Sequence, residues 1–255
     1  MGIPLFERIG RKVYLTEAGR EFLPYAVRSI SEAQEGMQKL WDMRKVYRGE
    51  LRIGVVYSLS PLLVACASRF SQTYPDIMLR LFHFSSISEL ADRVHDHRID
   101  FALSYKPSPL SPLIDTMELM SVSLCLIVKS DSPLAVLHEV SLRVVSELSL
   151  VLLENGMYLR KMIEKLAMDN GITLQPKAEV NNSNLSLQMV RTGKWCSISL
   201  QKTVIQFPDL IAIPIKEAHN SLVMSLLWLK NGYQKTAAQE MMRLIKENVE
   251  KDGIL

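Results

Sequence analysis

Short hydroxyl and amide side chains follow several apolar runs of this sequence, and they are suited to binding chemistry. Ser58 and Ser60, Ser86, and the pair Asn181 and Asn182 each stand where an apolar run ends and a helical pattern begins. Such side chains form hydrogen bonds without carrying charge, so together they suit a small polar ligand. Each one could instead cap only its own helix. Their convergence from several loops on one predicted groove favours binding.

The sequence contains no motif of a catalytic centre. It lacks a GxSxG nucleophile motif, a GxGxxG or phosphate-binding loop, and an HExxH zinc motif. Cys66, Cys125 and Cys196 are widely spaced, without a CxxC pair, which favours reduced thiols in a cytoplasmic protein. A peroxide-sensing pair is the alternative, although Cys66 lies in an apolar helical pattern. We therefore expect no enzyme activity, no metal and no cofactor.

Strands and helices alternate from residue 50 onward, and they would position these polar groups. Residues 51–57, 77–84 and 98–103 read as strands, with helical spacing between them. This order predicts a parallel, doubly wound sheet. A long run at 117–129 is expected to cross into a second unit, and residues 221–229 to return. Ligands bind at the carboxyl ends of such strands, where helix N-termini favour anions.

A long amphipathic helix is predicted to precede the sheet, from residue 16 to about residue 46. It would span about 45 Å, with Pro24 expected to kink it or to loosen its first turns. A helix of this length needs a partner, and a second copy of the chain would provide one. Packing on its own domain remains the alternative. The predicted contact face comprises Phe22, Ala26, Ile30, Ala33, Met37 and Leu40.

A basic ribbon is predicted before this helix. Residues 11–15 alternate in period two, and Thr16 stands where a helix N-cap belongs. The net charge of +3 is small, so basic groups must act locally if the protein binds nucleic acid. Arg8, Arg11 and Lys12 cluster in the ribbon, and we expect them to contact DNA phosphates.

The amino-acid sequence of this region resembles that of a known family. PLFER, then Arg11, then LTEAG is similar to the end of the winged helix-turn-helix domain of LysR-type transcriptional regulators. The strings LRIG, FSQTYPDIMLRL and RIDFAL resemble the effector domain of that family. Met1 and Gly2 stand where the family's recognition helix ends, so the resemblance implies that the base-reading helix is missing from this chain.

The resemblance implies an α/β fold with two doubly wound, Rossmann-like subdomains of the periplasmic-binding-protein type, preceded by a wing remnant and a long linker helix. The expected boundaries are 1–15 for the wing remnant, 16–48 for the linker and dimerisation helix, 49–122 with 220–255 for effector-binding subdomain I, and 123–219 for subdomain II.

The resemblance also implies a function and its partners. Positions matching Ser58, Ser86 and Asn181 line the effector pocket of the family, and Tyr105 stands where some relatives carry an effector-facing side chain. We expect a cytoplasmic homodimer or homotetramer that binds DNA and a small organic anion, and no membrane. The full expected effector set is Ser58, Leu59, Ser60, Ser86, Tyr105, Asn181 and Asn182.

Two other functions stay open at this point. A free-standing small-molecule binding protein of the periplasmic-receptor type would have the same two-lobed fold. The long helix counts against it, because solute receptors are usually monomeric. An enzyme on a similar scaffold is the third hypothesis, and the missing catalytic set counts against it.

Overall fold

The computed structural model describes residues 2–44, 47–109 and 111–252. An N-terminal hairpin, β1 (Phe6–Ile9) and β2 (Lys12–Leu15), leads into the long helix α1 (Glu17–Met43). Thr16 caps α1 as predicted, because its hydroxyl accepts a hydrogen bond from the Gly19 N–H at 2.9 Å. The helix continues unbroken through Pro24. Met1 and the expected end of the helix at residues 45–46 lie outside the described residues.

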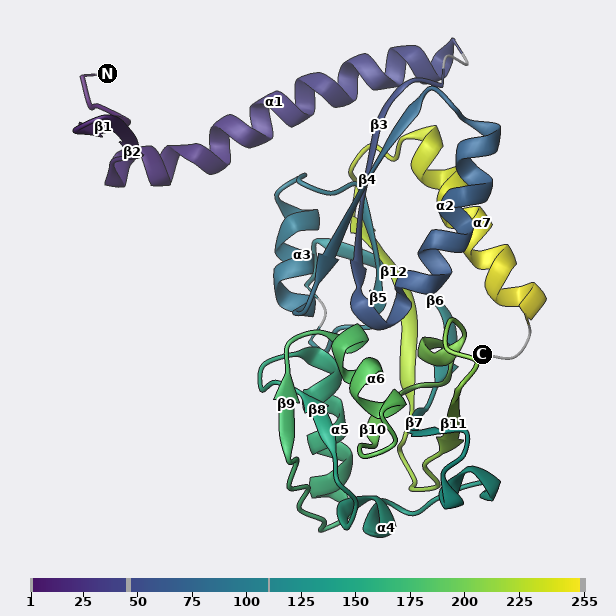
Figure 1. The fold of residues 1–255 in the computed structure, drawn as a ribbon. Coiled ribbons are helices and arrows are strands. Elements are labelled where there is room, and N and C mark those ends of the chain that lie inside the picture. The colour runs from purple at the N-terminus through teal and green to yellow at the C-terminus, as the bar shows by residue number, and fades with distance from the viewer. Residues whose placement is uncertain (1, 45–46, 110, 253–255) are drawn as a thin grey trace.

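α1 projects away from the rest of the molecule and carries the hairpin at its far end (Figure 1). Only its C-terminal half is docked, through a few polar contacts. Asp42 accepts hydrogen bonds from the Tyr233 hydroxyl at 2.7 Å and from the Thr236 N–H at 2.9 Å. His97 Nδ1 lies 2.7 Å from Glu35 Oε1. The helix therefore has a fixed base on the body and a free outer part.

A five-stranded sheet forms the first lobe, here called lobe I, in the order β4-β3-β5-β12-β6. The predicted strand–helix–strand order is confirmed for β3, β4 and β5, which pair in parallel. β12 returns from the end of the chain and pairs antiparallel with β5 and β6, so the sheet is mixed. The strands are β3 (Gly49–Val56), β4 (Ile77–Phe84), β5 (Phe101–Tyr105), β6 (Ile114–Val122) and β12 (Leu222–Leu229).

Three helices cover the sheet of lobe I, with α3 on one face and α2 and α7 on the other (Figure 1). α2 does not begin with Ser60 as its N-cap, which corrects the sequence prediction. A 3₁₀ turn, η1 (Tyr57–Leu59), precedes it, and Ser60 is already its first helical residue. The helices are α2 (Ser60–Thr73), α3 (Ile87–His95) and α7 (Thr236–Asp252).

The second lobe, lobe II, is built on a three-stranded antiparallel sheet and a two-stranded parallel pair. The larger sheet has the order β10-β7-β11. The strands are β7 (Leu124–Lys129), β8 (Val151–Leu153), β9 (Ala178–Val180), β10 (Ser197–Leu200) and β11 (Leu210–Pro214). The helices are α4 (Leu142–Ser146), α5 (Tyr158–Asp169) and α6 (Ser183–Arg191), with 3₁₀ turns η2 (Pro133–Val136) and η3 (Gln201–Val204).

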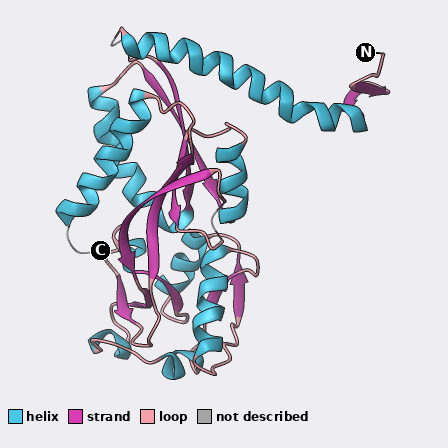
Figure 2. Ribbon diagram, turned by 180° about the vertical axis from the view of Figure 1, so that it is seen from behind, coloured by secondary structure: helices cyan, strands magenta, loops and turns pink. Residues whose placement is uncertain are grey.

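The chain crosses between the lobes twice, once from β6 to β7 and once from β11 to β12, as Figure 2 shows from behind. The Asn220 side chain ties the two crossings together. Its Oδ1 accepts from the Leu124 N–H at 2.8 Å, and its Nδ2 donates to the Ile215 carbonyl at 2.7 Å. One cluster of buried apolar residues continues through both lobes. Among the described residues, no helix is long and apolar enough to span a bilayer.

Candidate functional site

A cavity of about 440 Å³ lies between the lobes beside the first turn of α2. Lobe I contributes η1, the start of α2 and the end of β4, and lobe II contributes the start of α6 and η3. We call it the polar cavity. Its lining consists of Tyr57, Ser60, Pro61, Val64, His83, Asn182, Ser183, Asn184, Leu187, Thr203, Gln206 and Phe207.

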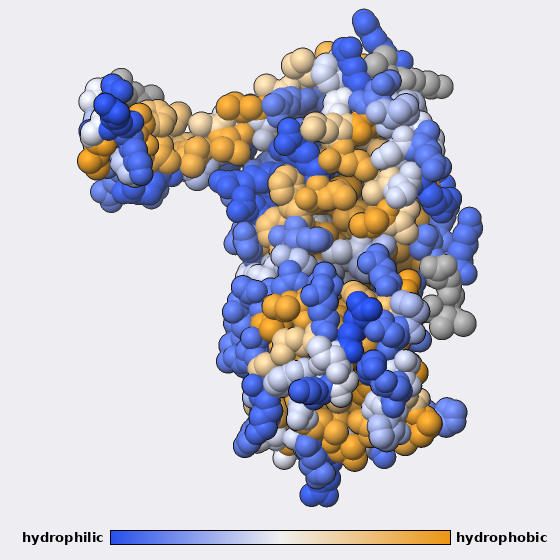
Figure 3. All heavy atoms as spheres, viewed as in Figure 1, coloured by the Kyte–Doolittle hydropathy of each residue, from blue (hydrophilic) through white to orange (hydrophobic). Residues whose placement is uncertain are grey.

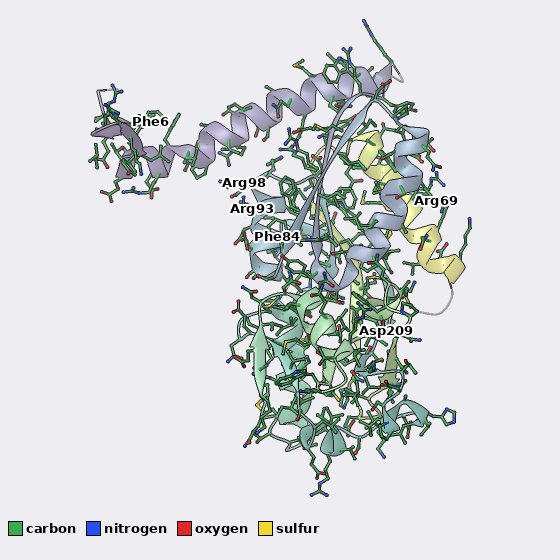
Figure 4. The ribbon with its side chains drawn as sticks, in the orientation of Figure 1. Phe6, Arg69, Phe84, Arg93, Arg98 and Asp209 are labelled. Carbon is green, nitrogen blue, oxygen red and sulfur yellow. The ribbon has the colours of Figure 1, made fainter. Side chains whose placement is uncertain are left out.

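His83 and Ser60 form the polar wall of this cavity on lobe I. Ser60 Oγ lies 2.7 Å from His83 Nε2, and the Tyr57 ring centre lies 4.6 Å from that of His83. Partial desolvation lowers the pKa of His83, so its imidazole is neutral at neutral pH. The neighbouring Phe84 marks this end of β4 in Figure 4. The sequence interpretation missed His83, although its place at the end of a strand was a usable signal.

Asn182 forms the polar wall on lobe II. It is the N-cap of α6, and its Oδ1 accepts from the N–H groups of Asn184 at 2.8 Å and Leu185 at 3.2 Å. Asn182 therefore caps its helix and also lines the cavity, and its role in effector binding stays a prediction.

A second cavity of about 250 Å³ lies on the other side of the α2 start, and we call it the apolar cavity. Ser58, Leu59 and Lys202 are among its lining residues, together with the crossing segment at Ser123. Cys125 also lines it, but burial raises the pKa of this thiol to about 11. The thiol is therefore protonated and unreactive at neutral pH.

Tyr105 occupies the centre of the junction between the lobes. Its side chain is 1% exposed, and its hydroxyl lies 2.5 Å from Ser58 Oγ. Its ring stacks on that of Tyr158 in lobe II, with centroids 5.3 Å apart and an interplanar angle of 15°. Burial raises the pKa of Tyr105 far above its ordinary value, so the hydroxyl stays protonated. Tyr105 thus packs between Ser58 of lobe I and Tyr158 of lobe II.

Ser86 lies apart from the polar cavity. It is the N-cap of α3, and it lines a groove of about 450 Å³ with Lys161 and the proline-rich loop at Pro107. Its hydroxyl lies 2.7 Å from Ser88 Oγ.

The structure therefore divides the expected effector set among several places. Ser60 and Asn182 meet in the polar cavity, whereas Ser58 and Leu59 line the apolar cavity. Asn181 is exposed and lines neither cavity.

The expected DNA and dimer contacts lie outside the two lobes. Arg8, Arg11 and Lys12 are all exposed on the hairpin. Apolar side chains are exposed along the projecting part of α1 (Figure 3), including Phe22, Ile30, Met37 and Leu40. Within the described ranges, no group of three or more His, Cys, Asp or Glu side chains is placed to hold a metal ion.

Comparisons with known proteins agree on one family. The family model of the LysR substrate binding domain matches residues 44–250. A probable RuBisCO transcriptional regulator of Cyanidioschyzon merolae is 30% identical over 252 residues, covering 93% of this chain and 81% of the relative. The RuBisCO operon transcriptional regulator of Allochromatium vinosum is 29% identical over 205 residues, covering 80% of this chain and 67% of the relative.

Solved structures show the same fold. Full-length BenM has a TM-score of 0.69 at 21% identity and covers 100% of this chain and 84% of that chain. The effector binding domain of QuiR, solved in complex with shikimate, has a TM-score of 0.66 at 18% identity and covers 80% of this chain and 98% of that chain. Because the family model matches most of its length, the chain belongs to the LysR family of transcriptional regulators.

Proposed function

We propose that this regulator senses a small organic molecule held between its two lobes, with the polar cavity as the principal site. The observation that carries the proposal is the polar cavity itself, about 440 Å³ in volume and walled by polar groups of both lobes. A ligand there contacts Ser60 and Asn182 at once, so its binding free energy depends on the angle between the lobes. Its relatives are transcriptional regulators rather than enzymes.

The other expected effector residues act around this site. Ser58 and Leu59 form the wall on the far side of the α2 start, and Tyr105 holds Ser58 in place. Asn181 precedes the cap of α6, and Ser86 caps α3 in the neighbouring groove. Effectors named for related structures are shikimate for QuiR and benzoate for BenM. An organic anion of this kind is the effector that we propose here.

The proposed regulator consists of a wing remnant, a linker helix and two effector-binding subdomains, in this order along the chain. We assign residues 1–15 to a wing remnant, 16–48 to the linker, 49–122 with 220–255 to subdomain I and 123–219 to subdomain II. The strands of lobe I and lobe II fall within the last two assignments. The assigned stretches at residues 1, 45–46, 110 and 253–255 lie outside the described residues.

Arg8, Arg11 and Lys12 contact DNA phosphates in this proposal, and α1 pairs with a second copy through its exposed apolar face. A homodimer or homotetramer would result. α1 and the hairpin then move together with lobe I, because Asp42 binds the residues that follow β12.

A thermal-shift screen of organic acids tests the site. A ligand at a hundred times its dissociation constant stabilises the protein by about 2.7 kcal/mol, which is a shift of several degrees. Val64→Trp fills the cavity from an exposed position of α2 and should abolish the shift. Ser68→Trp, one turn further on and outside the cavity, is the control and should keep it. A shift that survives Val64→Trp would refute the polar cavity as the site.

A further inference from the structure

The lining of the polar cavity carries no permanently charged side chain. None of its twelve lining residues is Lys, Arg, Asp or Glu. Lys202 lines the apolar cavity instead, and Lys161 lines the groove at α3. The nearby Arg191 is paired with Asp209 at 2.7 Å and lies over the Phe207 ring, 5.7 Å from its centre. Because an unpaired charge is costly to bury, this lining disfavours a ligand with several charges.

The N-terminus of α6 offers little to an anion. Helix N-termini bind anions through N–H groups that have no partner within the helix. Here the Asn182 side chain already accepts from the N–H groups of Asn184 and Leu185. At this end of α6, a negative charge therefore has to be recognised mainly through side chains.

One hydrogen-bonding side chain of the lobe II wall keeps a donor that is available to a ligand. The Asn182 carbonyl oxygen is held by the helix, which leaves its NH₂ group as a donor. Tyr57 and Phe207 add aromatic surface to the lining, and aromatic surface suits a flat ring.

His83 is the one lining residue that can acquire a positive charge. Tyr57 is the titratable lining residue beside it. The remaining polar groups of the lining are the hydroxyls and amides of α2, α6, η3 and the residues that follow η3. A proton on Nε2 can be donated to Ser60 Oγ, which frees the Ser60 hydroxyl hydrogen for a ligand oxygen. Protonation of His83 thus adds a charge and fixes Nε2 as a donor to Ser60 Oγ, which leaves the Ser60 hydroxyl hydrogen for the ligand.

We propose that the polar cavity takes a small ring compound bearing at most one negative charge, and that His83 is the specificity-determining residue that recognises this charge. The proposal rests on the function proposed above and narrows its ligand class. Binding of such a monoanion takes up a proton on His83, so affinity rises as pH falls. Dianions are excluded because the second charge meets no cation.

Benzamide, benzoate and isophthalate test this directly, because they present a ring with a charge of zero, −1 and −2. Dissociation constants are measured by titration calorimetry or ligand-observed NMR at pH 8 and pH 6, where the carboxylates stay ionised. Benzoate should bind about tenfold more tightly at pH 6, within the limit of tenfold per pH unit for one proton. Benzamide affinity should be independent of pH, and isophthalate should bind at least about tenfold more weakly than benzoate at pH 6.

His83→Gln keeps a hydrogen-bonding side chain but removes the titration. In this variant benzoate affinity should become independent of pH. Benzoate affinity that does not change with pH in the unmodified protein would overturn the role of His83. Absence of benzoate binding at millimolar concentration, or isophthalate binding as tight as benzoate, would overturn the ligand class.

Val64→Trp and Ser68→Trp separate this proposal from the proposed function. If isophthalate binds best and only Val64→Trp abolishes its binding, the cleft remains the effector site and the ligand class is wrong. If benzoate shows the expected pH dependence but Val64→Trp leaves it unchanged, the polar cavity is not the site, and both proposals fail.

Discussion

At the scale of single residues, Asn220 links the two segments that cross between the lobes, although asparagine is usually a surface residue. It is buried, and its carboxamide binds the backbone of both segments that cross between the lobes. Asn220→Ala leaves three buried backbone groups without these partners, so we expect a loss of about 2–4 kcal/mol in the free energy of unfolding. Urea denaturation measures it. The exposed Asn155→Ala is the control and should change little. Equal losses in both variants would contradict the role of Asn220.

Gly19 and Gly36 provide a matched pair within α1. A Cβ on Gly19 would lie 2.0 Å from the Leu5 carbonyl oxygen, whereas one on Gly36 would meet nothing within 4 Å. Gly19→Ala should displace the hairpin, and Gly36→Ala should stabilise the helix by about 0.5–1 kcal/mol. Amide hydrogen exchange of residues 4–16 should rise in the first variant alone. Unchanged exchange in Gly19→Ala would show that the hairpin is not packed against the helix in this way.

The residue types in the sequence were enough to predict part of the candidate site. The other residues were missed for a physical reason. Ser60 and Asn182 were recognisable because capping and binding use the same short polar side chains. His83 and Asn220 were missed because their partners are distant in sequence, as Leu124 is from Asn220. Tyr105 was expected to face a ligand, but strand position does not reveal that Tyr158 covers its ring. Its role in effector binding stays a prediction.

At the scale of elements, the base of α1 depends on the ionisation of Asp42. Partial burial raises the pKa of this carboxyl group, but hydrogen bonds from Thr236, Tyr233 and Gln38 together outweigh it and hold the pKa below 3.8. A carboxyl group with a lowered folded-state pKa stabilises the protein above its unfolded-state pKa and loses that effect as pH falls.

Asp42→Asn should therefore weaken the docking of α1 at pH 6 and reduce the stability that is lost between pH 5 and pH 3. Denaturant titrations at several pH values, with hydrogen exchange of the helix, measure both effects. Glu21→Gln, an exposed position in the same helix, is the control. A pH profile that is identical in Asp42→Asn and the unmodified protein would exclude this linkage.

The exposed face of α1 gives a prediction about assembly. Ile30 and Leu40 are 61% and 62% exposed, and each could bury its side chain against a second copy, at about 1.5–3 kcal/mol for full burial. Ile30→Glu with Leu40→Glu should shift the protein to monomer in sedimentation at micromolar concentration. Gln34→Glu adds the same kind of charge at an exposed polar position and should leave the dimer intact. A monomeric unmodified protein would contradict pairing through this face of α1.

Element order was the most predictable level of the fold. Period-two and helical spacing located β3, α2, β4, α3 and β5 in their order, because each pattern reflects burial of one face. The antiparallel pairing of β12, and the division of lobe II into an antiparallel sheet and a parallel pair, could not be read locally, since strand direction depends on distant connections. The start of α2 was misplaced because the 3₁₀ turn η1 has the same composition as a helix start.

At the scale of the whole molecule, the basic side chains of the hairpin give a test of DNA binding. Replacing Arg8, Arg11 and Lys12 by alanine should weaken binding to specific and unrelated DNA alike. The slope of log K against log salt should become shallower by roughly 0.9 for each phosphate that the variant no longer neutralises. Binding titrations over a range of salt concentrations measure the slope. An unchanged slope would mean that these side chains do not reach the phosphates.

The docking of α1 at one end only has a mechanical consequence. Its 27 residues form a lever of roughly 40 Å at 1.5 Å per residue. A tilt of about 10° at the Asp42 end moves the hairpin by roughly 7 Å, which is about two base-pair steps along the double helix. Two steps also rotate the contacted phosphates by roughly 70° around the DNA axis. A small change in the tilt of α1 on lobe I can therefore place the two hairpins of a dimer on different faces of the DNA.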